Sequence, residues 1–150
     1  MNSALMFSKA SDEWSTPQAF FDALHAEFHF TVDGAATAEN TKCADYWSAA
    51  DTWREGDWRG HVVWLNPPYS KVYAFMRRAQ AEAAGGATVV CLVPSRTDTR
   101  WWHDLAWDGE RHQPRAGVEV RFVRGRLKFG DGKNSAPFPS VVIIFRGQAR

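Results

Sequence analysis

Hydrophobic positions along the chain follow two spacings, which predict helices and strands in alternation. Apolar side chains recur about every fourth position in residues 17–27 and again in residues 71–84. The first stretch opens with the Ser-Thr-Pro of residues 15–17, a hydroxyl cap with a proline suited to a first turn, and the second stops at the glycine pair 85–86. Each stretch therefore predicts an amphipathic helix that buries one face.

Continuous apolar runs around these helices predict strands. The runs are residues 30–32, 62–65, 87–93, 118–123 and 141–145. An unbroken β-branched run such as residues 87–93 is typical of a strand buried on both faces of a parallel sheet, and the helix before it completes a βαβ unit. The last two runs are expected to pair antiparallel at one edge, with a polar loop over residues 108–117. The pattern predicts an α/β fold with a mixed, mostly parallel sheet.

The chain has the length and composition of one globular domain. Its 150 residues are 45% hydrophobic, which is enough apolar material for a single buried core. We predict one domain over residues 1–150, with residues 1–10 as a flexible tail. Those first residues are too few and too polar for a signal peptide, and no later apolar run is long enough to cross a bilayer, so the expected location is the cytoplasm.

Cysteine and histidine spacings do not indicate a disulfide framework or a metal site. Cys43 and Cys91 lie far apart, and neither belongs to a CxxC pair. His25 and His29 are four residues apart on the first predicted helix, which is a metal-ligand spacing, but no third ligand accompanies them. We therefore predict no metal, and we interpret Cys91 as a small buried hydrophobe within its strand.

The net charge is only +1, but it is unevenly distributed. Residues 1–60 hold four Lys and Arg against ten Asp and Glu, whereas residues 111–150 hold nine against two. A basic face that binds a polyanion follows if these side chains cluster in space. The alternative is a solvated basic surface with no partner.

Basic residues are expected in two loops. Arg96 and Arg100 follow the strand of residues 87–93, and the connection over residues 124–139 interleaves basic residues with aromatic ones. The basic residues of that connection are Arg124, Arg126, Lys128 and Lys133. Such a mixture suits a phosphate backbone and unstacked bases. The alternative is a surface loop with a partly buried aromatic anchor.

The strand over residues 62–65 stops at Asn66-Pro67-Pro68-Tyr69, and this quartet carries the clearest chemistry. Each proline fixes its own φ and extends the residue before it, so the Asn66 side-chain oxygen and the Pro67 carbonyl can converge as two acceptors. Two acceptors suit an exocyclic amine, whose lone pair they free for attack, and Tyr69 offers a flat face to stack a base. The alternative is a turn in which two prolines merely end a strand.

A second candidate lies where Asp33 closes the expected strand before Gly34, Ala35 and Ala36. A carboxylate followed by small residues suits a nucleoside cofactor, because the backbone can approach closely and the acid can pair with an ammonium or accept from a hydroxyl. The alternative is an ordinary strand-to-loop turn with an aspartate cap.

Five segments stand in the order typical of small phage-type, Dam-like DNA N6-adenine methyltransferases, and the chain resembles that family over nearly its whole length. The segments are DEWSTP at residues 12–17, VDGAA at residues 32–36, NPPY at residues 66–69, LVPSR at residues 92–96 and GRLKFG at residues 125–130. NPPY alone is shared with RNA and protein-glutamine methyltransferases, whereas the set of five is much more specific.

The resemblance implies a contracted Rossmann-like core that uses S-adenosylmethionine to methylate adenine N6 in DNA, with the target base flipped out of the helix. The implied catalytic residues are Asn66, Pro67, Pro68 and Tyr69. The implied cofactor contacts are Trp14, Thr16, Pro17, Asp33, Ala35 and Asn66. For Thr16 the alternative is plain N-capping of the first helix. The basic residues of the two loops become DNA contacts with short or relaxed sequence recognition, and a phage or prophage protein acting in a bacterial host is implied.

The chain departs from larger methyltransferases over residues 36–61, a polar stretch without a clear period. It is too short for the two βα units found there, so the ribose contact stays open between Asp45 and Asp51. Two alternatives to the DNA enzyme are kept: an RNA or protein-glutamine amino-methyltransferase, and a non-catalytic nucleic-acid-binding protein that retains the fold. The basic C-terminal quarter favours nucleic acid over protein, and the intact quartet favours catalysis.

Overall fold

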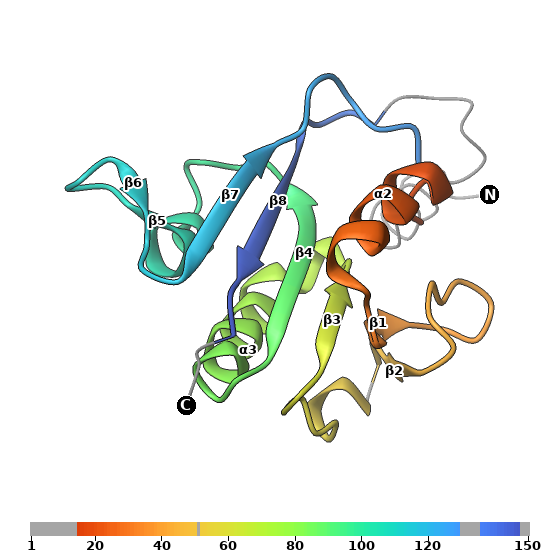
Figure 1. Cartoon of the computed structure of the whole chain (residues 1–150). Coiled ribbons are helices and arrows are strands. Elements are labelled where there is room, and N and C mark those ends of the chain that lie inside the picture. The colour runs from red at the N-terminus through yellow and green to blue at the C-terminus, as the bar shows by residue number, and fades with distance from the viewer. Residues whose placement is uncertain (1–14, 51, 130–135, 148–150) are drawn as a thin grey trace.

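A six-stranded sheet forms the centre of the structure (Figure 1). The computed structural model describes residues 15–50, 52–129 and 136–147, so the predicted tail of residues 1–10 lies outside the described residues. The strands are β1 (Val32–Ala36), β2 (Tyr46–Ser48), β3 (Val62–Leu65), β4 (Thr88–Pro94), β7 (Val118–Phe122) and β8 (Ser140–Phe145). Their order is β2-β1-β3-β4-β8-β7, and β8 runs in the direction opposite to that of the other five described strands. The predicted mixed, mostly parallel sheet is confirmed.

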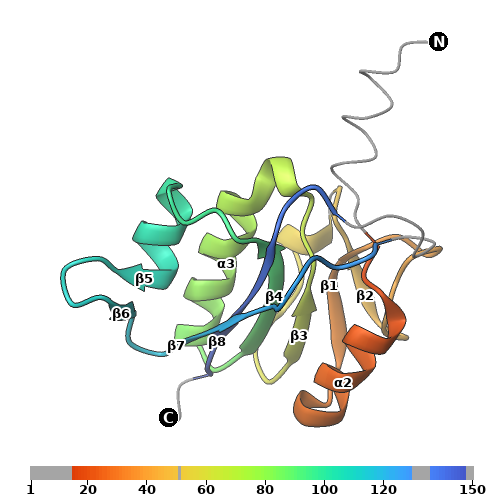
Figure 2. The ribbon, with the colours of Figure 1, turned by 90° about the horizontal axis from the view of Figure 1, so that it is seen from above.

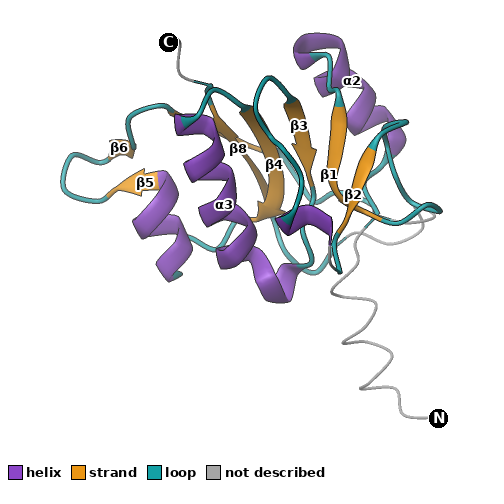
Figure 3. Cartoon of the chain, turned by 90° about the horizontal axis from the view of Figure 1, so that it is seen from below, coloured by secondary structure: helices purple, strands orange, loops and turns teal. Residues whose placement is uncertain are grey.

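Helices cover both faces of the sheet (Figures 2 and 3). Helix α2 (Gln18–Phe28) packs on one face, and α3 (Val72–Ala84) packs on the other together with the short π-helix η3 (Trp102–Ala106). The predicted helices are confirmed to within one residue at each end. Helix α3 stops at the glycine pair as predicted, where Gly85 N–H donates to the Glu82 carbonyl at 3.0 Å.

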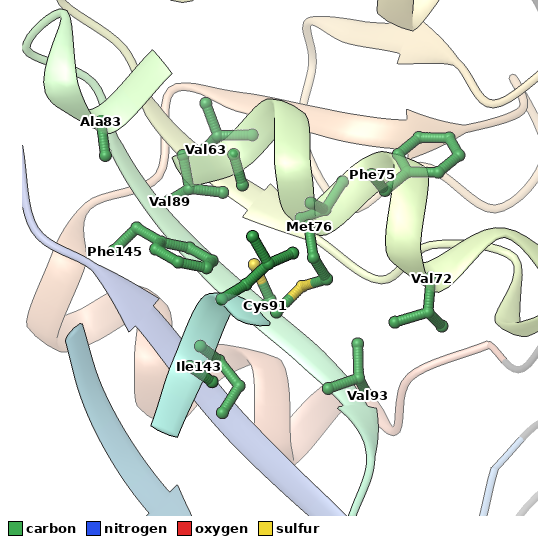
Figure 4. Close-up of a cluster of buried hydrophobic side chains, with 14 of the residues drawn as sticks. Val63, Val72, Phe75, Met76, Ala83, Val89, Cys91, Val93, Ile143 and Phe145 are labelled. Carbon is green, nitrogen blue, oxygen red and sulfur yellow. The ribbon is translucent and has the colours of Figure 1, made fainter. Parts of the chain in front are cut away.

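Alternate residues of the central strands form two hydrophobic layers. On β4, Val89 and Cys91 belong to the α3 layer, Val90 and Leu92 belong to the α2 layer, and all four are fully buried. Figure 4 shows the α3 layer, where Met76 and its neighbours on the helix face side chains of β3, β4 and β8. The apolar run of β4 is unbroken because both of its faces are covered.

Three tryptophans order the stretch between β1 and β3. Trp47 of β2 stacks on Trp58 with ring centroids 5.0 Å apart, and Trp53 of the short helix η1 (Thr52–Arg54) stacks on Phe75 of α3 at 3.9 Å. Strand β2 pairs in parallel with β1 at the edge of the sheet. The sequence shows no period here because Trp47 and Trp53 belong to separate short elements and Trp58 lies in the loop before β3.

Residues 108–117 are not one loop, and that prediction is wrong. Strands β5 (Trp107–Asp108) and β6 (Gln113–Pro114) pair there as a short antiparallel hairpin. The Asp108 carboxylate holds the turn by accepting from the backbone N–H groups of residues 110–111 at 3.0 and 3.1 Å. These are local polar contacts, so no hydrophobic period marks them.

Strand β1 extends past Asp33, so the prediction that Asp33 closes a strand is wrong. Asp33 pairs with Trp64 of β3, and Gly34 lets the two strands pack closely on the α3 side. A Cβ atom at Gly34 would lie 2.8 Å from Val63 Cγ1 and 3.1 Å from Leu65 Cδ1. The missing side chain therefore makes room for the core of the protein itself.

We expect Gly34→Ala to lower the free energy of unfolding by about 1–3 kcal/mol, because the added methyl group overpacks the core. Gly109→Ala is the matched control, since the nearest atom to its added Cβ is His103 Nδ1 at 3.6 Å. Urea unfolding followed by tryptophan fluorescence measures both variants. Equal unfolding midpoints for the two variants would contradict the close packing at Gly34.

Candidate active site

A cavity lies at the edge of the sheet where β1 and β3 end. Strand β2 lies on one side of β1 and β3 on the other, so the loops that follow β1 and β3 diverge, and open α/β sheets bind ligands at such switch points. The cavity encloses about 50 Å³. Its lining includes Thr16, Asp33, Ala35, Trp64, Asn66 and Pro68. The predicted acid and two members of the predicted quartet therefore line the same cavity.

The Asn-Pro-Pro-Tyr segment makes a rigid elbow between β3 and α3. Pro68 has an extended backbone, with φ −57° and ψ 126°, and its carbonyl accepts from Lys71 N–H at 2.9 Å to start the 3-10 turn η2 (Tyr69–Lys71). Pro67 is buried, and Asn66 is half-buried in the cavity wall. The two prolines thus turn the chain from the sheet edge into helix α3, as the strand-elbow-helix pattern predicts.

A distant part of the chain holds the Asn66 amide. Asn66 Nδ2 donates to Thr16 Oγ1 at 3.0 Å across 50 residues of sequence. Thr16 is only 4% exposed, and the N-terminal cap of α2 is Pro17, with no side-chain hydrogen bond to the helix. The predicted hydroxyl cap is therefore wrong, since the Thr16 hydroxyl accepts from Asn66 instead.

Asp33 provides a buried carboxylate on the β1 side of the cavity, where it is 3% exposed. Its Oδ1 accepts from Ala35 N–H at 3.2 Å, and its Oδ2 accepts from Lys42 N–H at 3.0 Å. Burial raises the pKa of Asp33 to about 6, although the two backbone N–H groups and the Lys42 charge oppose the increase. The acid therefore orders the loop after β1 and changes its charge near pH 6.

The other predicted cofactor contacts fall in different places. Ala35 is half-buried and lines the cavity, whereas Pro17 starts α2 and is not part of the cavity lining among the described residues. Trp14 and Asp51 lie outside the described residues. Asp45 is exposed, and its backbone carbonyl accepts a hydrogen bond from β1 at 3.0 Å.

Tyr69 lies beside the elbow, packed against the aromatic part of the α2 layer. Its ring meets that of Phe138 edge to face, with centroids 5.4 Å apart. The Tyr69 hydroxyl is buried without a hydrogen-bond partner among the described residues, and burial raises the pKa of Tyr69 above its usual value. The ring is therefore held by packing, with its polar end turned into the protein.

Basic residues lie at the sheet edge that carries the elbow. Strands β4 and β7 run parallel to β3, so the loops after all three leave the same edge (Figure 1). The exposed basic residues there are Arg96 and Arg100 after β4, and Arg124, Arg126 and Lys128 after β7. Lys133 lies outside the described residues. Five of the six predicted DNA contacts thus follow strands that end at one edge of the sheet.

Aromatic side chains anchor the connection between β7 and β8. Phe129 and Phe138 are buried and lie with ring centroids 6.0 Å apart. Ala136 N–H donates to the Leu127 carbonyl at 2.8 Å and draws the two ends of the connection together. The alternative of a surface loop with a buried aromatic anchor is confirmed for these two phenylalanines.

Ion pairs neutralise part of the positive charge of the C-terminal quarter. The Arg121 guanidinium donates two hydrogen bonds to the Glu27 carboxylate, each of 2.7 Å, and it also pairs with Glu119. Arg146 pairs with Glu119 as well, and both arginines lie over the Phe28 ring. These arginines tie α2 to the β7 side of the sheet. Because they are already paired with carboxylates, fewer positive side chains are available to a partner than the net charge of residues 111–150 suggests.

Within the described residues, no three or more His, Cys, Asp and Glu side chains are grouped to hold a metal ion. His25 Nδ1 accepts from Phe30 N–H at 3.0 Å, and His29 ends α2 with φ 55°. No helix in that same part of the chain has both the length and the apolar character to span a membrane.

Two cavity residues, Lys42 and Trp64, do not stand out in the sequence. Lys42 binds Asp33 through its backbone, and its Nζ donates to Gln18 Oε1 at 3.0 Å. It lies in an irregular loop, where no spacing signals a role. In the sequence, Trp64 has the pattern of an ordinary strand residue. It lies beside Asp33 because β1 pairs with β3.

The fold and the site define an α/β protein with a pocket at a switch point of the sheet, lined on one side by Asn66 and Pro68 of the Asn-Pro-Pro-Tyr elbow. A family model described as DNA N-6-adenine-methyltransferase (Dam) matches residues 4–148, and the chain belongs to this family.

Two phage proteins named DNA N-6-adenine-methyltransferase are similar to the chain. One, from Haemophilus phage HP1 (strain HP1c1), is 32% identical over 147 residues, covering 95% of this chain and 84% of that protein. The other, from Escherichia phage T1, is 27% identical over 152 residues, covering 90% of this chain and 63% of that protein. The chain thus spans less than two thirds of the phage T1 protein. No solved structure matches the chain.

We expect the contribution of Asp33 to stability to fall as pH rises from about 4 to 6. The pKa of Asp33 is about 6 in the folded protein against an ordinary 3.8, so the folded state binds more protons in this window and the free energy of unfolding decreases with pH. Urea unfolding of the wild type and Asp33→Asn at several pH values should show the stability of the wild type relative to the variant falling through this window. A carboxyl NMR titration of Asp33 with its midpoint near 3.8 would contradict the buried environment.

Proposed function

We propose that this chain transfers the methyl group of S-adenosylmethionine to N6 of adenine in DNA. The observation that carries the proposal is that Asn66 of the Asn-Pro-Pro-Tyr elbow lines the same cavity as the buried acid Asp33, at the switch point of the sheet. Membership of the DNA N-6-adenine-methyltransferase family supports the proposal, and both phage relatives carry that name.

The sheet is then a contracted form of the Rossmann-like core of S-adenosylmethionine-dependent methyltransferases. The parallel order β2-β1-β3-β4 and the reversed strand β8 between β4 and β7 support this assignment. The residues at the carboxyl ends of β1 and β3, where the loops diverge, would hold the cofactor.

The chemistry of the cavity fits this cofactor. The Asp33 carboxylate can pair with an ammonium group, Ala35 leaves space beside it, and Thr16 belongs to the same lining. Trp14 and Pro17 are proposed as further cofactor contacts. When bound, S-adenosylmethionine supplies an electrophilic methyl group.

The elbow prepares the target amine for attack. The Asn66 side-chain oxygen and the Pro67 backbone carbonyl each accept one N–H bond of the amine, which frees the nitrogen lone pair. The proton leaves to solvent after the attack, so no side chain has to act as a general base. Pro68 holds the elbow rigid, and Tyr69 stacks the flipped base, a contact worth about 1–3 kcal/mol.

The basic edge binds the DNA backbone. Phosphate contacts come from Arg96, Arg100, Arg124, Arg126 and Lys128, with Lys133 as a sixth. The segments that hold these residues start from the same edge of the sheet as the elbow. A duplex bound by them would therefore lie across the mouth of the cavity. Because the relatives come from phages, the proposed place of action is the cytoplasm of a bacterial host.

We expect the protein to form N6-methyladenine in DNA, detected by mass spectrometry of nucleosides after incubation with S-adenosylmethionine. Asn66→Ala should lower the rate of methyl transfer by about 100-fold or more, because it removes an acceptor used in the transition state. Its cofactor affinity, measured by calorimetry, should stay near that of the wild type.

Parallel reactions with duplex DNA, single-stranded DNA, tRNA and a glutamine-bearing protein separate the alternatives. Label only in RNA or only in protein would replace the DNA assignment. If calorimetry detected no cofactor binding by the wild type, a non-catalytic nucleic-acid-binding protein would be the better description.

Neutralising one basic residue at the edge, as in Arg124→Gln, Arg126→Gln or Lys128→Gln, should weaken DNA binding for all sequences alike. Each change should lower the slope of log affinity against log salt by about one, because one phosphate contact is lost. Arg59→Gln is the matched control, since Arg59 precedes β3 at the opposite end of that strand and pairs with Asp57 at 3.0 Å. Fluorescence anisotropy at several salt concentrations measures the slopes, and equal slopes for all four variants would remove these loops from the interface.

A further inference from the structure

We infer that Thr16 is a positioning residue that sets which end of the Asn66 amide meets the target amine. This role rests on the proposed methyl transfer and adds to it a side chain that need touch no reacting atom. The contact that carries it is the 3.0 Å hydrogen bond from Asn66 Nδ2 to Thr16 Oγ1.

An asparagine amide can adopt two orientations in a site of fixed shape, related by a 180° flip that exchanges Oδ1 and Nδ2. Its oxygen and NH2 ends are nearly the same size, but the oxygen accepts hydrogen bonds and the NH2 group donates them. Methyl transfer needs the oxygen toward the amine, since an NH2 group there would set donor against donor. With Nδ2 held at Thr16, the planar amide directs Oδ1 away from Thr16.

The Thr16 hydroxyl is held in place for this contact. Thr16 is 4% exposed, and Pro17 restricts it to an extended backbone. The Pro17 carbonyl accepts from Phe21 N–H at 3.1 Å, and Phe21 and Leu24 bury the helix against the sheet. Within the described residues, the N-terminal cap of α2, Pro17, makes no side-chain hydrogen bond, and the Thr16 hydroxyl accepts from Asn66 Nδ2.

The same geometry distinguishes positioning from cofactor binding. Thr16 lines the cavity, so a contact with the cofactor would alter cofactor affinity when the hydroxyl is removed. A residue that only orients Asn66 alters the rate of the chemical step and leaves that affinity unchanged. The two roles therefore separate in one variant.

The first test compares Thr16→Val, which keeps the shape but loses the acceptor, with Thr16→Ser, which keeps the hydroxyl. Under single-turnover conditions with saturating DNA and cofactor, Thr16→Val should slow methyl transfer about tenfold or more, and Thr16→Ser should restore most of the rate. Calorimetry should find cofactor affinity within about threefold of wild type for both. A rate equal to or above wild type in Thr16→Val, or a loss of cofactor affinity that matches the loss of rate, would overturn the inference.

The second test repeats Thr16→Val in an Asn66→Asp background. A carboxylate has two oxygens and no amide to orient, so the valine should then cost at most about threefold in rate. The same loss in both backgrounds would show that Thr16 acts through the fold or the cofactor, and would reject the positioning role.

Side-chain amide NMR of Asn66 supplies a readout that does not depend on activity. In the wild type the Asn66 NH2 signal should show a hydrogen-bonded, slowly exchanging proton, and this should be lost in Thr16→Val and kept in Thr16→Ser. An unchanged signal in Thr16→Val would overturn the inference even if the Asn66→Asp background were inactive. If the wild type methylated no adenine, the proposed function would fail, while the NMR comparison would still decide how the amide is held.

Discussion

The pairing of β1 with β3 is the constraint on which the site depends. In this register Asp33 lies beside Trp64, and Trp64 stands two residues before Asn66, so the acid and the elbow belong to neighbouring strands. Because the strands are parallel, both end at the same edge of the sheet. Gly34 permits the close packing of this pair, since a side chain there would collide with Val63. A shift of one residue would turn Asp33 to the other face and separate it from the cavity.

Helix α2 connects the site to the rest of the fold, and hydrophobic burial decides where it lies. Phe21 and Leu24 are buried on the sheet, and side chains of this size contribute about 1.5–3 kcal/mol each. The pair between Glu27 and Arg121 is largely exposed to solvent, which weakens its contribution to stability. Burial therefore fixes the helix axis, the ion pair favours one alignment of its far end, and the near end brings Thr16 to Asn66.

The chemistry assigned to this site needs few ionisable groups. In the proposed reaction, the elbow acts through oriented dipoles of an amide and a carbonyl, whose strength does not change with pH. Asp33 is the group at the cavity whose charge changes near pH 6, because its burial outweighs its two backbone hydrogen bonds. Any pH dependence near neutrality would then reflect cofactor binding on the β1 side more than the methyl transfer itself. The two effects separate because the amide and carbonyl of the elbow are dipoles that do not titrate, whereas Asp33 is an acid that does.

Local patterns in the sequence determined the two amphipathic helices, strands β3, β4, β7 and β8 and the Pro-Pro elbow, because each depends on the spacing or the backbone restriction of adjacent residues. Strand β2 was not predicted, and β1 was predicted at residues 30–32 instead of Val32–Ala36. The tertiary structure alone decided that Thr16 binds Asn66, that Trp47 and Trp53 pack into the core, and that Arg121 and Arg146 are spent on ion pairs. These outcomes join residues far apart in the chain, and no period within a short window reports which partner a side chain will meet. Asp33 depends on both the sequence and the tertiary structure. Its residue type suggested a site, whereas the pairing of β1 with β3 buries it, and burial raises its pKa.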